Sequence, residues 1–173
     1  MTPIPFRIEA LGNEHHREQF SCGEEALDRY FQTQATQDIR RRIANCFVAI
    51  EAATNAIAAY YTIAAASIPL VDLSPEDAKR LPRYPTLPAV LIGRLAVDHK
   101  FQGRGLGSAL LADAAQRTIQ APPAVYALLV DAKNDRAAAF YQRFGFRPLL
   151  SRPKSLYLPI ATAQRAFLGR ATH

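Results

Sequence analysis

An apolar run that leads into three glycines at alternate positions places the strongest limit on how this chain can fold. The run covers residues 90–97, has the length of a β-strand, and is followed by Gly103, Gly105, Gly107 and then helix-like sequence. Glycines let successive backbone N–H groups converge, and a helix N-terminus adds positive potential. The order strand, glycine turn, helix therefore predicts an anion site for a phosphate-bearing cofactor, with a flexible surface turn as the alternative.

Two common phosphate-binding loops do not match this spacing. A nucleotide-triphosphate loop needs a lysine directly after its last glycine, whereas Ser108 follows Gly107. A dinucleotide-binding loop needs its third glycine one residue later and an acidic residue about 20 positions further on. The sequence therefore favours a different phosphate-bearing cofactor.

The composition is that of an ordinary globular domain. The 173 residues are enough for one sizeable core, so a single domain over residues 1–173 is expected. Hydrophobic residues make up 49% and charged residues 21%, which argues against long disordered stretches. A net charge of +6 suggests a polyanionic partner, although a basic surface also serves solubility.

Cysteine and histidine usage indicates neither a disulfide framework nor a metal site. Cys22 and Cys46 stand alone and read as reduced, cytoplasmic thiols, and the adjacent His15 and His16 point apart in regular structure. The N-terminus lacks an apolar signal core, and the longest apolar stretch, around residues 56–66, is shorter than the roughly 20 residues of a membrane-spanning helix. We expect a cytoplasmic protein without a metal or a membrane partner.

The first third of the chain predicts an edge strand and a helix. Residues 6–9 alternate between apolar and polar, and Ser21–Glu24 fits a capping box that would begin a helix. Apolar residues then recur at helical spacing up to Ile39 and predict a buried face, on which Tyr30 is read as a core residue. The following Arg40, Arg41 and Arg42 suit either the negative end of the helix dipole or contact with nucleic acid.

The rest of the chain predicts alternating strands and helices. Residues 46–50 and 57–64 are predicted to form a hairpin. Ser74 begins a short helix with Pro75 at its first position, and the proline-rich residues 81–88 form an extended connector. A second basic cluster lies there, formed by Lys79, Arg80 and Arg83. The remaining predicted elements are a helix from Leu106 to before Pro122, a strand over 125–130, a helix over 134–144 closed by Gly145, and last strands from Phe146 to Ile160.

Two motifs at the ends of neighbouring strands carry a family resemblance. Gln102–Gly107 resembles the pattern Gln/Arg-x-x-Gly-x-Gly/Ala, and residues 134–146 resemble Asn-x-x-Ala-x-x-Phe-Tyr-x-x-x-Gly-Phe. Both patterns are those of the GNAT N-acetyltransferases, and in an α/β sheet both segments would lie where ligands bind. The resemblance implies an α/β fold with a mixed, mostly antiparallel sheet that is splayed around acetyl-CoA and flanked by about four helices.

Further segments are similar to one subgroup, the acetyltransferase toxins of bacterial toxin–antitoxin modules. They are Phe20–Gly23, Leu27–Phe31, Leu81–Pro88, Gly93–Asp98 and Leu156–Pro159. The resemblance implies transfer of acetyl to the α-amine of aminoacyl-tRNA, which blocks translation, and neutralisation by a small ribbon-helix-helix antitoxin. A homodimer is common among similar toxins.

The resemblance also implies roles for individual residues. Backbone groups of Leu95, Ala96 and Val97 would pair with the pantetheine arm, and Tyr141 would protonate the departing thiolate or would alternatively be a core aromatic among Phe140, Phe144 and Phe146. Asn134 would hydrogen-bond the cofactor's amide region or only cap a helix, and Phe140 is assigned to the cofactor site. The backbone that would hold the pyrophosphate is that of Gln102, Gly103, Arg104, Gly105, Leu106, Gly107 and Ser108.

No general base is evident. The stretch 91–97 contains no carboxylate, Asp98 lies past its end, and Glu51 is a remote candidate. An α-amine has a pKa near 7.7–8.0, compared with about 10.4 for lysine, so much of an α-amine is already neutral at cellular pH. The missing base therefore favours an α-amine substrate over a lysine.

Arg94 interrupts the apolar strand beside the expected acetyl site. It would contact tRNA phosphate or the acceptor end, or it would pair with Asp98 or another acid. The two basic clusters would hold the tRNA backbone through salt-sensitive contacts. Two rival functions remain: an acetyltransferase for a small amine or a protein N-terminus without an antitoxin, and a binding protein that performs no transfer.

Overall fold

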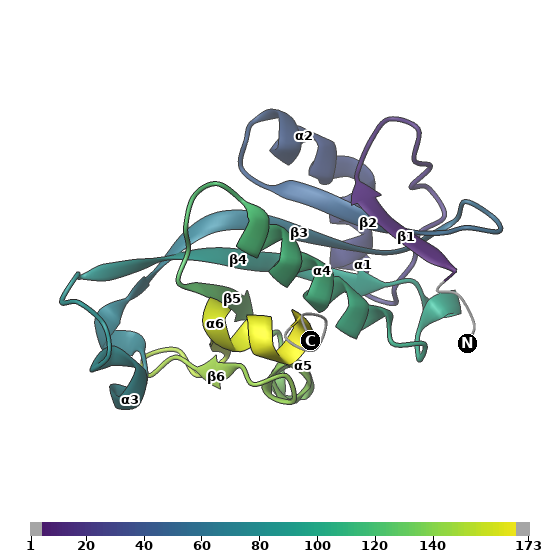
Figure 1. Ribbon diagram of the computed structural model, residues 1–173. Coiled ribbons are helices and arrows are strands. Elements are labelled where there is room, and N and C mark those ends of the chain that lie inside the picture. Colours follow the sequence, from purple (N-terminus) through teal and green to yellow (C-terminus); the bar gives the residue numbers. More distant parts are fainter. Residues whose placement is uncertain (1–4, 169–173) are drawn as a thin grey trace. The chain divides into compact units, whose positions relative to one another are not determined.

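Seven strands and the helices between them make up the part of the chain that the computed structural model describes, residues 5–168 (Figure 1). Residues 1–4 of the N-terminal stretch lie outside the described part. The strands are β1 (Phe6–Ala10), β2 (Asn45–Glu51), β3 (Ile57–Pro69), β4 (Thr86–Val97), β5 (Ala127–Asp131), β6 (Arg147–Pro148) and β7 (Ser155–Pro159). Their order in the sheet is β1-β2-β3-β4-β5-β7-β6.

The pairing of the strands is mixed and mostly antiparallel, which confirms the prediction. β2 is antiparallel to β1 and to β3, and β7 is antiparallel to β5 and to β6. β4 and β5 are parallel, with Ala89 opposite Ala127 and Ile92 opposite Val130. β3 and β4 are longer than the predicted strands, because their apolar and small residues extend the strands beyond the strongest apolar runs.

The chain forms two compact units. One comprises the residues up to Ala64 together with Gly93–Asp113, and the other comprises Ala65–Ile92 and the residues from Ala114 onward. We call them the first and the second unit.

Aromatic side chains build the core of the first unit. The helical stretch consists of α1 (Glu25–Arg29), a π-helical segment η1 (Tyr30–Gln34) and α2 (Ala35–Arg40). Phe31 stacks on Tyr60 of β3 with 4.3 Å between ring centroids, and Phe20 packs edge-on against both rings. Ala96 of β4 belongs to the same core. The predicted apolar helix face is therefore confirmed, with a π turn in its middle.

The predicted capping box at Ser21–Glu24 is wrong. The backbone N–H of Ser21 donates to a carboxylate oxygen of Asp98 at 3.0 Å, and Gly23 has a φ of +94°. The left-handed glycine turns the chain before any helix can form. α1 therefore begins only at Glu25, and Glu24 at its N-cap makes no side-chain capping bond.

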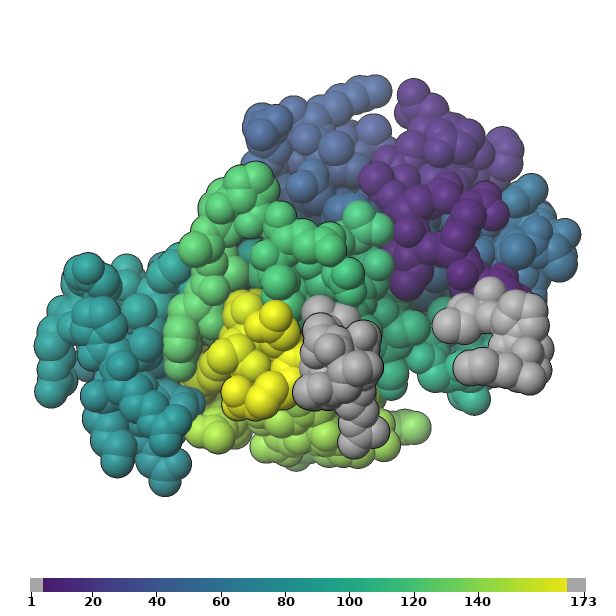
Figure 2. Space-filling model, viewed as in Figure 1, coloured from purple at the N-terminus to yellow at the C-terminus, as the bar shows by residue number. Residues whose placement is uncertain are grey.

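The second unit is held around Tyr157 of β7. Its hydroxyl donates to Asp77 at 2.6 Å and accepts from the backbone N–H of Ser74 at 3.1 Å. Ser74 caps α3 (Pro75–Ala78) by accepting from the N–H of Asp77, as the sequence predicts. These bonds anchor the connection between β3 and β4, which lies at the surface (Figure 2, teal).

The other helical segments of the described chain are η2 (Leu70–Asp72), η3 (His99–Phe101), α4 (Leu106–Gln120), α5 (Asp135–Gln142), α6 (Ile160–Ala163) and η4 (Gln164–Leu168).

None of the helices within residues 5–168 has both the length and the apolar character needed to cross a membrane.

Candidate active site

The glycine turn leads into α4 in the first unit. Gly103 and Gly105 both have a φ of +79°, and no heavy atom lies within 4 Å of the place where a Cβ would stand on either residue. Gly107 lies in the first turn of α4. Left-handed residues at alternate positions turn successive N–H groups toward one side, and a fifteen-residue helix adds the positive end of its dipole. This open turn fits a diphosphate.

Side chains of the turn hold its base in place. Gln102 Nε2 donates to the carbonyl of Val97 at 2.9 Å and to that of Cys22 at 3.2 Å. The Arg104 guanidinium lies 5.4 Å from the centroid of the Phe101 ring and 3.9 Å from a carboxylate oxygen of Glu51. Gln102 thus fixes the exit of β4, while the exposed Arg104 adds positive charge beside the turn.

The end of β4 presents two faces. Ala96 is buried in the aromatic core, whereas Leu95 and Val97 are half-buried. Because side chains alternate along a strand, Leu95 and Val97 lie on the face opposite Ala96. The carbonyl of Val97 accepts the bond from Gln102, which fixes the end of the strand.

The acids near β4 are engaged in structural bonds. Asp98 is 2% exposed, and its carboxylate accepts from the backbone N–H groups of Ser21 and Lys100. Glu51 accepts from the hydroxyl of Thr54 at 2.7 Å within the β2–β3 turn. Asp98 is thus held by the backbone, and Glu51 binds Thr54 and lies 3.9 Å from Arg104, so both carboxylates serve structural contacts.

Tyr141 lies on α5 in the second unit among aromatic rings. Its ring packs edge-on against Phe140 and Phe146, at centroid distances of 5.2 and 5.5 Å. The residue is 9% exposed, and burial raises the pKa of its phenol to about 12. No residue of the described chain hydrogen-bonds to the phenol oxygen. A protonated phenol without a protein partner is suited to donate a proton to a substrate atom.

Asn134 precedes α5 and caps it. Its side-chain oxygen accepts from the N–H of Ala137 at 2.8 Å. The predicted helix cap is therefore present, and the cap bond uses the oxygen but not the amide nitrogen of this exposed residue. Phe140 is half-buried and packs edge-on against Phe144 as well as Tyr141, and Gly145 ends the helix with a φ of +97°.

Arg94 of β4 does not pair with Asp98, because both oxygens of that carboxylate bind backbone N–H groups. Its guanidinium carbon instead lies 3.5 Å from the centroid of the Tyr30 ring. The phenol of Tyr30 donates to Asp38 at 2.7 Å. The charge of Arg94 acts on Asp38, and of the alternatives that the sequence left open for Arg94, the pair with Asp98 is absent.

Sequence comparison places these features in a family. The sequence profile described as "Acetyltransferase (GNAT) domain" matches residues 42–148. The chain belongs to the GNAT acetyltransferases. A tRNA-acetylating toxin of Mycobacterium tuberculosis is 37% identical over 152 residues, which cover 87% of this chain and 89% of that toxin.

Solved structures of similar acetyltransferases cover almost the whole chain. AtaT in complex with acetyl-methionyl-tRNAfMet superposes with a TM-score of 0.83 at 28% identity, over 94% of this chain and 99% of AtaT. A tyrosine-to-phenylalanine mutant of the toxin AtaT, bound to acetyl-CoA and the C-terminus of the antitoxin AtaR, superposes with a TM-score of 0.78 at 25% identity, over 95% of this chain and 99% of the mutant. As a GNAT enzyme, this acetyltransferase takes acetyl-CoA as its acetyl donor.

The structure assigns the predicted site residues of this acetyltransferase to two units. The first unit holds β4, the glycine turn, Arg94 and the cluster Arg40, Arg41 and Arg42 at the end of α2. The second unit holds Asn134, Phe140, Tyr141 and the cluster Lys79, Arg80 and Arg83. All six residues of the two basic clusters are exposed.

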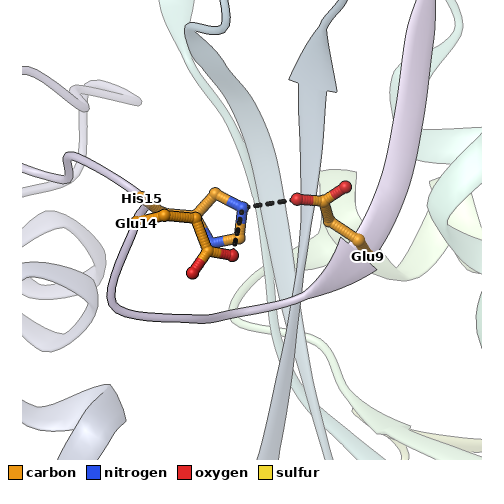
Figure 3. Close-up of side chains that lie close together, drawn as sticks. All are labelled: Glu9, Glu14 and His15. Carbon is orange, nitrogen blue, oxygen red and sulfur yellow. Dashed lines mark hydrogen bonds and ion pairs between the residues drawn. The ribbon is translucent and has the colours of Figure 1, made fainter.

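Glu9 of β1 comes together with Glu14 and His15 of the following loop, and the atoms of these residues that could bind a metal lie within 4.8 Å of one another (Figure 3). His15 Nδ1 accepts from the N–H of Gly12 at 2.9 Å, so Nε2 carries the proton and donates to Glu9 at 2.6 Å. The bond from His15 lowers the pKa of Glu9. Hydrogen bonds within the protein therefore account for this group, and they tie the loop after β1 to the strand.

Two features of the acetyltransferase were missed from the sequence. One is the bond between Tyr30 and Asp38; an aspartate on the inner face of a predicted helix was the signal that such a partner existed. The other is a cavity of about 650 Å³ in the first unit, whose walls include Phe20, Ile57 and Lys100. Its walls come from three segments that lie far apart in the sequence, so no local pattern predicts the cavity.

Proposed function

We propose that this acetyltransferase moves the acetyl group of acetyl-CoA to the α-amine of aminoacyl-tRNA, and that it thereby blocks translation as the toxin of a toxin–antitoxin pair. The observation that carries the proposal is the open glycine turn at α4 in a chain that is 37% identical to a tRNA-acetylating toxin over 87% of its length. We further propose that residues 1–173 act as one acetyltransferase domain.

The first unit would bind the donor mainly through its backbone. N–H groups of residues 102–108 hold the diphosphate, and backbone groups of Leu95, Ala96 and Val97 pair with the pantetheine arm. Asn134 and Phe140 of the second unit contact the arm as well. Acetyl-CoA supplies a thioester, whose carbon–sulfur bond breaks as the new carbon–nitrogen bond forms.

Tyr141 completes the proton balance of the transfer. Its phenol gives a proton to the departing sulfur, which suits a group that remains protonated because burial raises its pKa to about 12. The amine attacks as the neutral base, the nitrogen then loses one proton to water, and the Tyr141 phenolate regains one proton from water. An α-amine needs no enzymatic base for this step, because its pKa lies near 7.7–8.0.

The basic surface would hold the nucleic acid. Arg94 and the cluster at the end of α2 contact the tRNA from the first unit, and the cluster around α3 contacts it from the second. Each contact neutralises a phosphate and releases counterions, so the affinity should fall steeply with salt.

The proposed partners and location follow from the same similarity. AtaT is bound to the C-terminus of the antitoxin AtaR in a solved structure. We propose that a ribbon-helix-helix antitoxin neutralises this chain in the same way, that the chain forms a homodimer, and that it acts in the cytoplasm.

Release of free thiol from acetyl-CoA, followed with a thiol reagent, tests the proposal. We expect release when charged tRNA is present and none with the same tRNA after deacylation, because deacylation removes the α-amine. Release with small amines or a peptide N-terminus, but not with charged tRNA, would assign the enzyme to another acceptor class. No release with any acceptor would leave only a binding function.

A further inference from the structure

The guanidinium of Arg94 packs on an aromatic ring, but its N–H donors make no bond within the described residues. It lies 3.5 Å from the centroid of the Tyr30 ring, the range of a strong cation–π contact. Arg94 is half-buried, and within residues 5–168 its guanidinium has no hydrogen bond or ion pair. A guanidinium presents five N–H donors in a planar fork that matches phosphate. The stack therefore orients donors whose acceptor is not part of this unit.

The Tyr30 ring is itself held by a buried acid. Its hydroxyl donates to one oxygen of Asp38 at 2.7 Å, and Gln34 Nε2 donates to the other oxygen at 3.3 Å. Asp38 is 9% exposed. A hydrogen bond from phenol to carboxylate shifts electron density onto the ring, which strengthens its attraction for a cation.

The π-helical segment η1 places these groups together. It begins at Tyr30 and ends at Gln34, so the donor ring and the amide that binds Asp38 stand at its two ends. π turns are rare in α-helices and occur often at functional sites. The irregularity thus coincides with the residues that orient Arg94.

A second arginine, Arg41, follows Asp38 by three residues in the sequence. Arg41 stands at the C-cap of α2, and its charge acts on Asp38 together with that of Arg94. The next residue, Arg42, has a φ of +59°, which turns the chain away at this point.

We propose that Arg94 binds a backbone phosphate of the nucleic-acid substrate, and that Tyr30 and Asp38 are positioning residues for this contact. The inference rests on the proposed function and deepens it, because it assigns an orienting role to two residues that touch no substrate. The competing explanation is that Arg94 only fills space against Tyr30. The two explanations differ in how the residues depend on one another.

A double-mutant cycle tests the proposal, with bulk deacylated bacterial tRNA as the probe and affinity measured over a series of salt concentrations. We expect Arg94→Ala to weaken binding about tenfold and to lower the slope of log affinity against log salt by about 1. Tyr30→Leu should move both values in the same direction. The double variant should match Arg94→Ala alone, because a ring without its arginine has nothing to orient.

Milder variants keep the test valid if Tyr30→Leu does not fold. Tyr30→Phe retains the ring but loses the bond to Asp38, and Asp38→Asn retains an acceptor without the charge. Each should weaken tRNA binding less than Arg94→Ala does and leave the KM for acetyl-CoA unchanged. The charge control is Arg7→Ala, which removes an exposed arginine that pairs with Glu9 on β1.

The outcomes separate this proposal from the proposed function. Additive losses in the cycle, or an unchanged salt slope for Arg94→Ala, would overturn the positioning role even if the wild type acetylates charged tRNA. A non-additive cycle in an enzyme that releases no thiol with charged tRNA would instead support the phosphate contact and reject the proposed acceptor. An equal change of the salt slope for Arg7→Ala and Arg94→Ala would mean that Arg94 contributes only general positive charge. That result would also overturn the proposal.

Discussion

Tyr30 and Tyr141 are both buried tyrosines on helices, yet their surroundings suit them to opposite tasks. Tyr30 donates its proton to Asp38 and carries the Arg94 guanidinium on its ring. Tyr141 is surrounded by the rings of Phe140 and Phe146, and no described residue hydrogen-bonds to its hydroxyl. The first phenol is occupied by the protein, whereas the second is available to a ligand.

The difference shows that burial alone does not decide what a tyrosine does. Burial raises the pKa of both phenols, and for Tyr30 the bond to Asp38 raises it further, because ionisation would place two negative oxygens together. Tyr30 thus acts through its ring and Tyr141 through its proton. A single oxygen atom, removed from each in turn, should separate the two roles.

The largest effect is expected for Tyr141→Phe. Loss of a general acid typically costs a factor of about 10² to 10⁴, so kcat for acetyl transfer should fall at least about a hundredfold. The KM for acetyl-CoA should change little, because the ring and its aromatic neighbours remain. Steady-state thiol release with charged tRNA measures both constants.

Tyr30→Phe and Tyr84→Phe serve as comparisons in the same assay. Tyr30→Phe should raise the KM for tRNA while kcat is nearly retained. Tyr84→Phe removes a hydroxyl group from a residue that is 63% exposed, and it should change neither constant. Wild-type kcat in the Tyr141 variant would end the role of that phenol as an acid. A kcat loss of similar size at Tyr30 would abolish the contrast between the two tyrosines.

Much of the fold follows from local sequence signals. The apolar run before Gly103 predicts a strand, Ser74 with Pro75 predicts the start of α3, and Gly145 predicts the end of α5, and each element is present. Elements whose ends depend on distant partners were predicted less well. Ser21 looks like a helix cap in its local sequence, but Asp98, which is 77 residues away, binds its N–H.

The same difference between local signals and distant partners applies to the candidate site. The glycine turn and the motif around Tyr141 are continuous in sequence, so their existence and the resemblance that they carry were predictable. The surroundings of Arg94 were not, because Tyr30 and Asp38 belong to a different element and meet Arg94 only through the packing of the helical stretch on β4. The sequence left Arg94 between a tRNA contact and an acidic partner, and the structure adds a ring on which its guanidinium packs.

The pH dependence of catalysis is the second expected effect, at about tenfold. An amine with a pKa near 7.7–8.0 must lose its proton before it attacks, so kcat/KM should rise from pH 6.5 and level off above pH 8.5. Because the pKa of Tyr141 is raised to about 12, the phenol stays protonated and no falling limb from it should appear below pH 10. A decline of thiol release between pH 8.5 and 10, with the protein still folded, would contradict the assignment of Tyr141 as the acid.

The smallest effect concerns the stability that Asp38 contributes. The bond from Tyr30 lowers the pKa of Asp38 below its ordinary value of 3.8, so the charged form stabilises the folded state above that pH, and the contribution is lost as the pH falls through the lowered folded-state pKa. Asp38→Asn retains an acceptor for Tyr30 but cannot be charged, so it should lower the free energy of unfolding at pH 7 by roughly 1 kcal/mol. Urea unfolding at pH 7 and at pH 2.5 should show this difference shrinking in acid. A difference that stays constant with pH would mean that the variant disturbs packing, and Tyr30 would then be an ordinary core aromatic whose position does not depend on a charged partner.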